Sequence, residues 1–146
     1  MKKNHTYLPI LFLSVILAGC TGYVSSIPDR KVYFKRNINT EKISMPGTYL
    51  YVTTTRGIDE IGFGGLLIYH ALNNGYYAVD LACPHEANPI VRISPPDDLG
   101  QCRCDSCGEV FAMAAGDGFP LKGISKEPLK SYNVSIDEWD FITIYR

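Results

Sequence analysis

The chain has 146 residues, which is enough for one domain of ordinary size and little beyond it. Hydrophobic residues make up 46% of the chain and charged residues 20%, a balance that excludes a mainly disordered protein. The 14 basic and 15 acidic side chains nearly cancel, so charge gives no reason to expect a nucleic-acid partner. The five cysteines are an odd number and need an explanation.

The first twenty residues predict export. Two lysines, Lys2 and Lys3, precede a mostly apolar run over residues 8–18. At about 1.5 Å per residue, this run is too short to cross about 30 Å of hydrocarbon as a helix, but it has the length of a signal-peptide core. Residues 17–20 (LAGC) resemble the lipobox of bacterial lipoproteins, in which the cysteine is lipidated and becomes the new N-terminus.

The resemblance implies a signal peptide over residues 1–19 and a lipid on Cys20. Several acyl chains on one cysteine would anchor the protein stably, at about 0.8 kcal/mol per buried methylene. Residues 20–30 are mostly small and polar and are predicted to tether the domain to the membrane. An ordinary secretory signal, with Cys20 left as a free thiol, is the alternative.

The expected location is the bacterial cell envelope, on the periplasmic or cell-surface side of a membrane. That compartment is oxidising, so disulfides have to be considered for the other four cysteines.

Residues 31–146 are predicted to form an all-β domain, because short β-rich runs alternate with turn signals and no stretch predicts a long amphipathic helix. Residues 73–75 (NNG) predict a hairpin turn, since Asn and Gly tolerate positive φ. His70 lies in an apolar run and is expected to be a hydrogen-bonded sheet residue. The predicted architecture is a sandwich or barrel. The predicted strands cover residues 32–38, 49–55, 66–72, 76–81, 90–93, 110–114, 131–136 and 141–145.

Two pairs of residues are candidate metal ligands. Cys83 and His85 form a Cys-x-His pair, and Cys104 and Cys107 form a Cys-x-x-Cys pair after a spacer. Each pair directs two donors toward one point, so together they supply four ligands for a tetrahedral metal site or a small iron–sulfur cluster. Glycine and proline concentrate over residues 89–128, a turn-rich region that needs a constraint beyond strand hydrogen bonds.

This pattern resembles that of the Rieske iron–sulfur family, in which Cys-x-His is followed by Cys-x-x-His in an all-β domain. Residues 83–86 (CPHE) are similar to the family's first loop and residues 104–111 (CDSCGEVF) to its second. The resemblance extends over residues 45–146. It implies a Rieske-like antiparallel sandwich or barrel with a small cluster-binding subdomain of two loops at about residues 82–128.

The function that the resemblance implies is electron transfer. A [2Fe–2S] cluster would be held by Cys83, His85, Cys104 and Cys107. The protein would pass electrons to a redox protein partner, as a carrier or accessory subunit rather than as an enzyme alone. Cys107 stands where the family has its second histidine. The third thiolate would add a negative charge and lower the potential below the Rieske range of about −150 to +300 mV.

Three alternatives to a cluster remain open. A structural zinc ion suits the same Cys3His donor set, two disulfides could pair the four cysteines, or the site could hold nothing. Zinc or disulfides would make the protein a non-redox binding or assembly lipoprotein with a Rieske-like fold. The leader favours these alternatives, because folded iron–sulfur cargo usually travels on a twin-arginine signal and this leader has only lysines. Cys102 is either a spare ligand or a disulfide partner.

Overall fold

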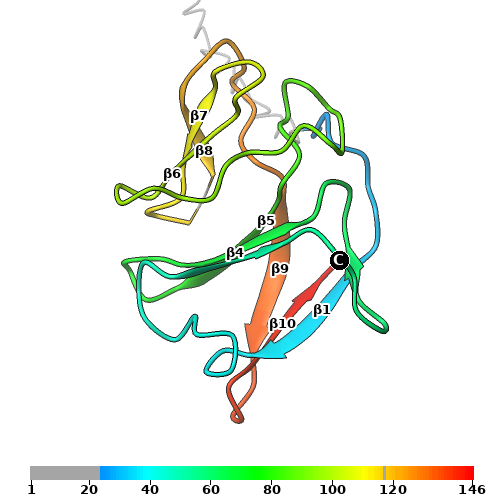
Figure 1. Cartoon of the computed structure of the whole chain (residues 1–146), viewed down its shortest axis with the longest axis vertical. Coiled ribbons are helices and arrows are strands. Elements are labelled where there is room, and N and C mark those ends of the chain that lie inside the picture. The colour runs from blue at the N-terminus through cyan, green and yellow to red at the C-terminus, as the bar shows by residue number, and fades with distance from the viewer. Residues whose placement is uncertain (1–23, 117) are drawn as a thin grey trace, which may run out of the picture.

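A computed structural model describes residues 24–116 and 118–146, which form strands and no helix (Figure 1). The predicted all-β class is therefore confirmed. The predicted signal peptide and Cys20 lie outside the described residues. Within the described ranges, no helix is long and apolar enough to cross a membrane. The strands are β1 (Val32–Asn37), β2 (Tyr49–Val52), β3 (Glu60–Ile61), β4 (Leu66–His70), β5 (Tyr76–Asp80), β6 (Gln101–Arg103), β7 (Val110–Ala112), β8 (Phe119–Lys122), β9 (Ser131–Ile136) and β10 (Phe141–Tyr145).

The strands form two antiparallel sheets. The larger sheet has seven strands in the order β2-β4-β5-β9-β10-β1-β3, and the smaller has the order β6-β7-β8. The small sheet stands at one end of the molecule, beyond β4 and β5, and the β9–β10 turn lies at the opposite end (Figure 1). The chain thus matches the predicted arrangement of an antiparallel body with a small subdomain.

Strand β4 separates two hydrophobic cores. All five of its residues are buried. Because successive side chains of a strand point to opposite faces, Leu66 and Ile68 enter one core, and Leu67 and Tyr69 enter the other.

The first core lies inside the large sheet. It combines residues of β4 and β5 with residues of β1 and β10, although β9 lies between these pairs in the sheet order. The sheet must therefore curl so that its two halves face each other. The buried residues of this core are Val32, Phe34, Ile38, Ile43, Leu66, Ile68, Ala78, Tyr132, Ile142 and Ile144.

The second core joins the outer face of β4 and β5 to the small sheet. Three of its buried members are cysteines, so the segments that carry them pack directly against the large sheet. The buried residues of this core are Leu67, Tyr69, Ala71, Val79, Leu81, Cys83, Ile93, Cys102, Cys104, Phe111, Met113 and Leu129.

The β4–β5 hairpin confirms the turn predicted at residues 73–75. Asn74 has a φ of 67°, and Gly75 N donates to Asn73 Oδ1 at 3.0 Å. The expected role of His70 is confirmed as well. Its ring nitrogens lie 3.1 Å from Ile43 O and 3.1 Å from Asn74 Oδ1, so the ring is held by polar contacts within the fold.

The strand predicted over residues 90–93 is wrong. This segment makes only isolated bridges, from Arg92 to Ala82 and from Ile93 to Cys104. The chain turns just before it, where Asn88 Oδ1 accepts a hydrogen bond from the backbone N of Ile90 at 3.1 Å. The segment is thus a link between the two cysteine loops rather than a strand of either sheet.

The described part of the predicted tether, residues 24–30, lies against the domain. Ile27 is buried, and Lys130 Nζ donates to its carbonyl oxygen at 2.7 Å. Ser26 Oγ donates to Pro84 O at 2.6 Å. Composition predicted a polar linker because one isoleucine among small polar residues gives no periodic signal.

Candidate metal centre

Three sulfur atoms meet between the two predicted loops. The Sγ atoms of Cys83, Cys104 and Cys107 all lie within 4.8 Å of one another, with Cys83 Sγ and Cys107 Sγ 3.6 Å apart. Two sulfurs bound to one tetrahedral ion at about 2.3 Å each would be about 3.8 Å apart. The observed spacing is close to that value and exceeds a disulfide bond of about 2.0 Å. The three sulfurs are therefore free of a disulfide and close enough to bind one metal ion.

The two loops are closed by the same backbone pattern. Ala87 N donates to Cys83 O at 2.9 Å, and Gly108 N donates to Cys104 O at 2.8 Å. The closing residue has positive φ in both loops, 46° at Ala87 and 76° at Gly108. An alanine in that conformation is strained by about 1–2 kcal/mol, so the contacts around the first loop must offset this strain.

Further backbone bonds connect the loops to their surroundings. Cys83 N donates to Val91 O at 3.0 Å, and Cys104 N donates to Glu109 O at 2.8 Å. The bridge between Ile93 and Cys104 then joins the first loop's return segment to the second loop. The relative position of the two loops is therefore set by backbone hydrogen bonds.

Burial disfavours the ionised form of two of the three sulfurs. Burial raises the pKa of Cys83 and of Cys107 above that of an ordinary thiol. Backbone N–H groups of His85 and Glu86 donate to Cys83 Sγ, and that of Glu109 donates to Cys107 Sγ, which partly opposes this rise in pKa. A bound cation would replace the thiol protons, and these donors would then stabilise the thiolates.

Asp80 positions the approach to the first loop, and the sequence analysis did not single it out. Its carboxylate is fully buried and accepts four hydrogen bonds. The donors are the backbone N–H groups of residues 63–64, that of Ala82 at 2.8 Å, and the Tyr132 hydroxyl at 2.6 Å. An acidic residue inside the apolar run YAVDLA was the available signal. Because Ala82 precedes Cys83, this carboxylate fixes the end of β5 from which the loop departs.

Glu109 connects the second loop to residues 123–127. Its side chain is fully buried, and Oε1 accepts a hydrogen bond from Ser125 N at 2.5 Å. Its Oε2 has no hydrogen-bond partner among the described residues. A Cβ added at Gly123 would lie 2.3 Å from Glu109 Cγ, so this segment lies tightly against the second loop.

The structure brings three of the four predicted ligands together. His85 is exposed, and its ring nitrogens lie outside the group of sulfurs. A fourth ligand at His85 therefore stays a prediction. Cys102 is buried in the second core, where burial raises its pKa to about 12, and its sulfur does not join the group.

The donor set defines the class of protein. Three cysteine sulfurs suit zinc or iron–sulfur centres and do not suit magnesium or calcium, which prefer oxygen ligands. The chain is thus an all-β protein with a candidate cysteine metal centre between its two sheets.

Comparisons with known proteins add a structural likeness. No protein-family model matches the sequence, and no curated protein matches it. The chain is similar to the structure of a proposed NADH-dependent nitrite reductase small subunit from Mycobacterium tuberculosis, with 14% sequence identity over 81% of this chain and 97% of that chain, and a TM-score of 0.47. A likeness of this degree says nothing of what this chain binds.

Proposed function

We propose that the chain is an electron-transfer protein of the bacterial envelope that holds a [2Fe–2S] cluster. The observation that supports this function is the meeting of three cysteine sulfurs on two similarly closed loops. Cys83, Cys104 and Cys107 would hold the cluster, with His85 as the predicted fourth ligand. A bound cluster would supply one-electron oxidation and reduction.

The residues around the sulfurs have separate roles in this proposal. Ser106 Oγ donates to Glu86 Oε1 at 2.9 Å, which holds the tips of the two loops together. Backbone N–H groups donate to the Cys83 and Cys107 sulfurs and would stabilise their negative charge. His85 is exposed and Cys107 half-buried, so a redox partner could approach the centre from this side.

Membrane anchoring belongs to the same proposal. A lipid on Cys20 would place the protein on the periplasmic or cell-surface side of a membrane. The lipobox-like residues 17–20 support this location. Mass spectrometry of the protein extracted from membranes tests it: the lipid-bearing N-terminus at Cys20 is expected, and an unmodified Cys20 would contradict it.

Metal content tests the cofactor. The protein should be purified without oxygen, its visible and electron paramagnetic resonance spectra recorded, and iron, sulfide and zinc assayed together. Iron and sulfide in equal amounts, with the spectrum of a reduced [2Fe–2S] centre, are expected. A colourless protein with one zinc and no iron would overturn the electron-transfer function.

The sulfur spacing favours one second candidate, a structural zinc site. All three sulfurs are close enough to bind a single ion, and the 3.6 Å separation of Cys83 Sγ and Cys107 Sγ fits a tetrahedral centre. Sulfurs on different irons of a cluster would have to be farther apart than sulfurs on one ion. The protein would then be a non-redox binding or assembly lipoprotein, and the same assay separates the two.

A further inference from the structure

The described chain begins at the end of the molecule that carries the cysteine loops. Ser26 Oγ donates to Pro84 O, next to Cys83, and Ser25 Oγ donates to Glu127 Oε1 at 2.9 Å. The buried Ile27 holds this N-terminal segment (residues 24–30) in place. The segment is therefore fixed between the first cysteine loop and the segment that contacts Glu109.

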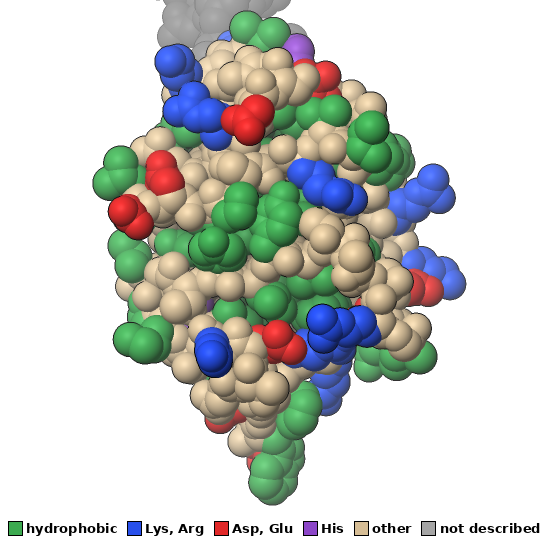
Figure 2. Space-filling model, viewed as in Figure 1, with side chains coloured by type: hydrophobic (Ala, Val, Ile, Leu, Met, Phe, Trp, Pro, Cys, Tyr) green, Lys and Arg blue, Asp and Glu red, His purple; other side chains and the backbone are tan. Residues whose placement is uncertain are grey.

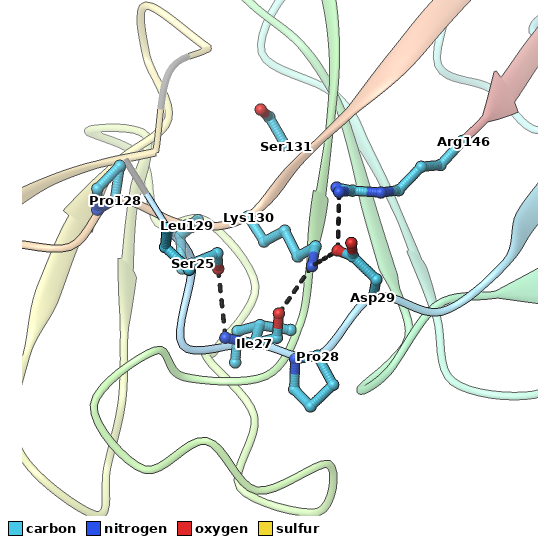
Figure 3. A pocket seen from close by; sticks show the side chains of 10 residues that line it. Ser25, Ile27, Pro28, Asp29, Pro128, Leu129, Lys130, Ser131 and Arg146 are labelled. Atoms are coloured by element: carbon cyan, nitrogen blue, oxygen red, sulfur yellow. Dashed lines mark hydrogen bonds and ion pairs between the residues drawn. The ribbon is translucent and has the colours of Figure 1, made fainter. Parts of the chain in front are cut away.

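An ion pair secures the same segment further along. Lys130 Nζ lies 2.5 Å from Asp29 Oδ1, and Arg146 Nη2 lies 2.7 Å from the same oxygen (Figure 3). Lys130 is buried, and it also donates to the carbonyl oxygen of Ile27. These contacts line a cavity of about 560 Å³, and with the buried Ile27 they join the segment to the domain.

The distance from Cys20 to this fixed segment is short. Five peptide steps separate Cys20 from Ser25 (25 − 20), which span at most about 18 Å when fully extended. A folded chain of the 127 residues from Cys20 onward (146 − 19) measures about 36 Å across. An anchor on Cys20 could not reach around the domain, so the end that carries the cysteines would stay beside the membrane.

This end also exposes apolar side chains and lysines. Residues 118–126 include the exposed Lys122 and Lys126 and no acidic residue. Hydrophobic and basic side chains occur together at the upper end in Figure 2, among a few acidic ones. Of the acidic residues at this end, Glu86 and Glu127 accept hydrogen bonds from serines, while Asp105 in the second cysteine loop is exposed. The exposed apolar residues, each 55% to 88% exposed, are Val24, Ile90, Phe119, Leu121 and Ile124.

We propose that this end of the molecule lies against the lipid bilayer, with the apolar side chains at the headgroup layer and the two lysines near lipid phosphates. The proposal rests on the lipidation of Cys20 in the proposed function. Apolar side chains combined with lysines are the chemistry that binds a membrane interface. The metal centre would then face a partner embedded in that membrane rather than one in solution.

Fluorescence quenching in vesicles tests the orientation. Trp139, the single tryptophan, is exposed in the turn between β9 and β10, at the opposite end of the molecule. The lipidated wild type is therefore the matched control for Ile124→Trp and Ile90→Trp, each made with Trp139→Phe. Both isoleucines are exposed, so neither change disturbs a core. Each protein is reconstituted in vesicles of zwitterionic and anionic phospholipids brominated near the headgroup.

The expected result is that either new tryptophan loses about half of its fluorescence while Trp139 loses none, since interfacial side chains enter the bromine-bearing layer. Equal, weak quenching at all three positions in protein that carries its lipid would overturn the orientation and leave the anchoring intact. Absence of the lipid on Cys20 by mass spectrometry would overturn both, so the two failures are distinguishable.

Discussion

Cys107 and Cys102 are both thiols whose pKa is raised by burial, yet only Cys107 belongs to the group of sulfurs. The difference comes from their backbone context. Cys102 lies in β6 opposite Phe111, where its side chain joins the second core, whereas Cys107 lies in the closed loop that begins at Cys104. The odd number of cysteines thus includes one that packs as a small apolar residue.

Cys107→Ser should therefore lower the metal content of the purified protein at least about tenfold, because loss of one thiolate removes a ligand that no described neighbour replaces. Cys102→Ala, the matched control, should retain its metal. Assay of iron, sulfide and zinc per chain checks both variants. Full metal content in Cys107→Ser, or its loss in Cys102→Ala, would show that the wrong cysteine has been assigned.

Cys107→His tests the electronic role of the third thiolate. A neutral imidazole removes one negative charge from the centre, so the reduction potential should rise by about 100–300 mV toward the Rieske range. Protein-film voltammetry or a redox titration followed by electron paramagnetic resonance measures the change. An unchanged potential in a protein with full cluster content would mean that Cys107 does not bind the cluster.

Asp80 should contribute strongly to stability, because its buried carboxylate is the acceptor for four donors. Asp80→Ala leaves these donors without a partner and should lower the free energy of unfolding by about 3–5 kcal/mol. The exposed Asp98 provides a control, whose change to alanine should cost less than about 0.5 kcal/mol. Urea unfolding of the two variants measures the difference, and similar midpoints would contradict the role of Asp80.

The sequence could identify the three cysteines of the centre but not how they are supported. The spacing of the two motifs was enough to predict that Cys83, Cys104 and Cys107 lie close together, because each tight loop directs its ligand residues toward one point. Apart from the bond from Ala82 N, the hydrogen bonds of the Asp80 and Glu109 side chains join residues 16 or more apart, as in the bond from Gly64 N to Asp80 and that from Ser125 N to Glu109. Such contacts depend on tertiary packing, which no local pattern reports.

Strands whose side chains alternate clearly between buried and exposed could be predicted from the sequence. Strands β9 and β10 have the predicted bounds, and their side chains alternate with the two-residue period of a half-buried strand. The short strands β3, β6 and β8 were missed. β8 contains Pro120, which cannot donate to a ladder, and β6 has only three residues, so neither shows a period that could be recognised in sequence.

The segment after β8 offers a test of element packing. Gly123 has a φ of 135°, and a Cβ there would meet the buried Glu109 side chain at 2.3 Å. Gly123→Ala should displace Glu109 and the adjoining second loop, and should reduce retention of metal during dialysis by at least about threefold. Gly57→Ala is the control, because Gly57 also has positive φ but has open space around its Cβ position. Equal metal retention in the two variants would show that the segment does not support the centre.

At the scale of the whole molecule, the two cores would make the sheets unequal in their dependence on a bound metal. The first core contains no cysteine, whereas the second contains Cys83, Cys102 and Cys104 and packs against Cys107. The large sheet has an apolar interior of its own. The small sheet has short strands and shares its buried core with the cysteines.

Removal of the metal with a chelator should therefore loosen the small sheet and leave the large sheet folded. Amides of β6, β7 and β8 should exchange with deuterium about tenfold faster or more, and those of β1 and β10 at unchanged rates. Hydrogen exchange with mass spectrometry measures both regions in one sample. Uniformly faster exchange would mean that the two cores unfold together, and no change in either would mean that the centre does not stabilise the small sheet.

The attachment of residues 24–30 has a mechanical consequence. Along the covalent chain from Cys20, the first described side chains that bond to the domain are Ser25 and Ser26, which contact Glu127 and Pro84. Force applied through a lipid on Cys20 would thus be delivered at the loop of Cys83 before it reached either sheet. Tension on the anchor would therefore change the positions of the sulfurs first. It would reach the β9–β10 turn, at the opposite end of the molecule, last.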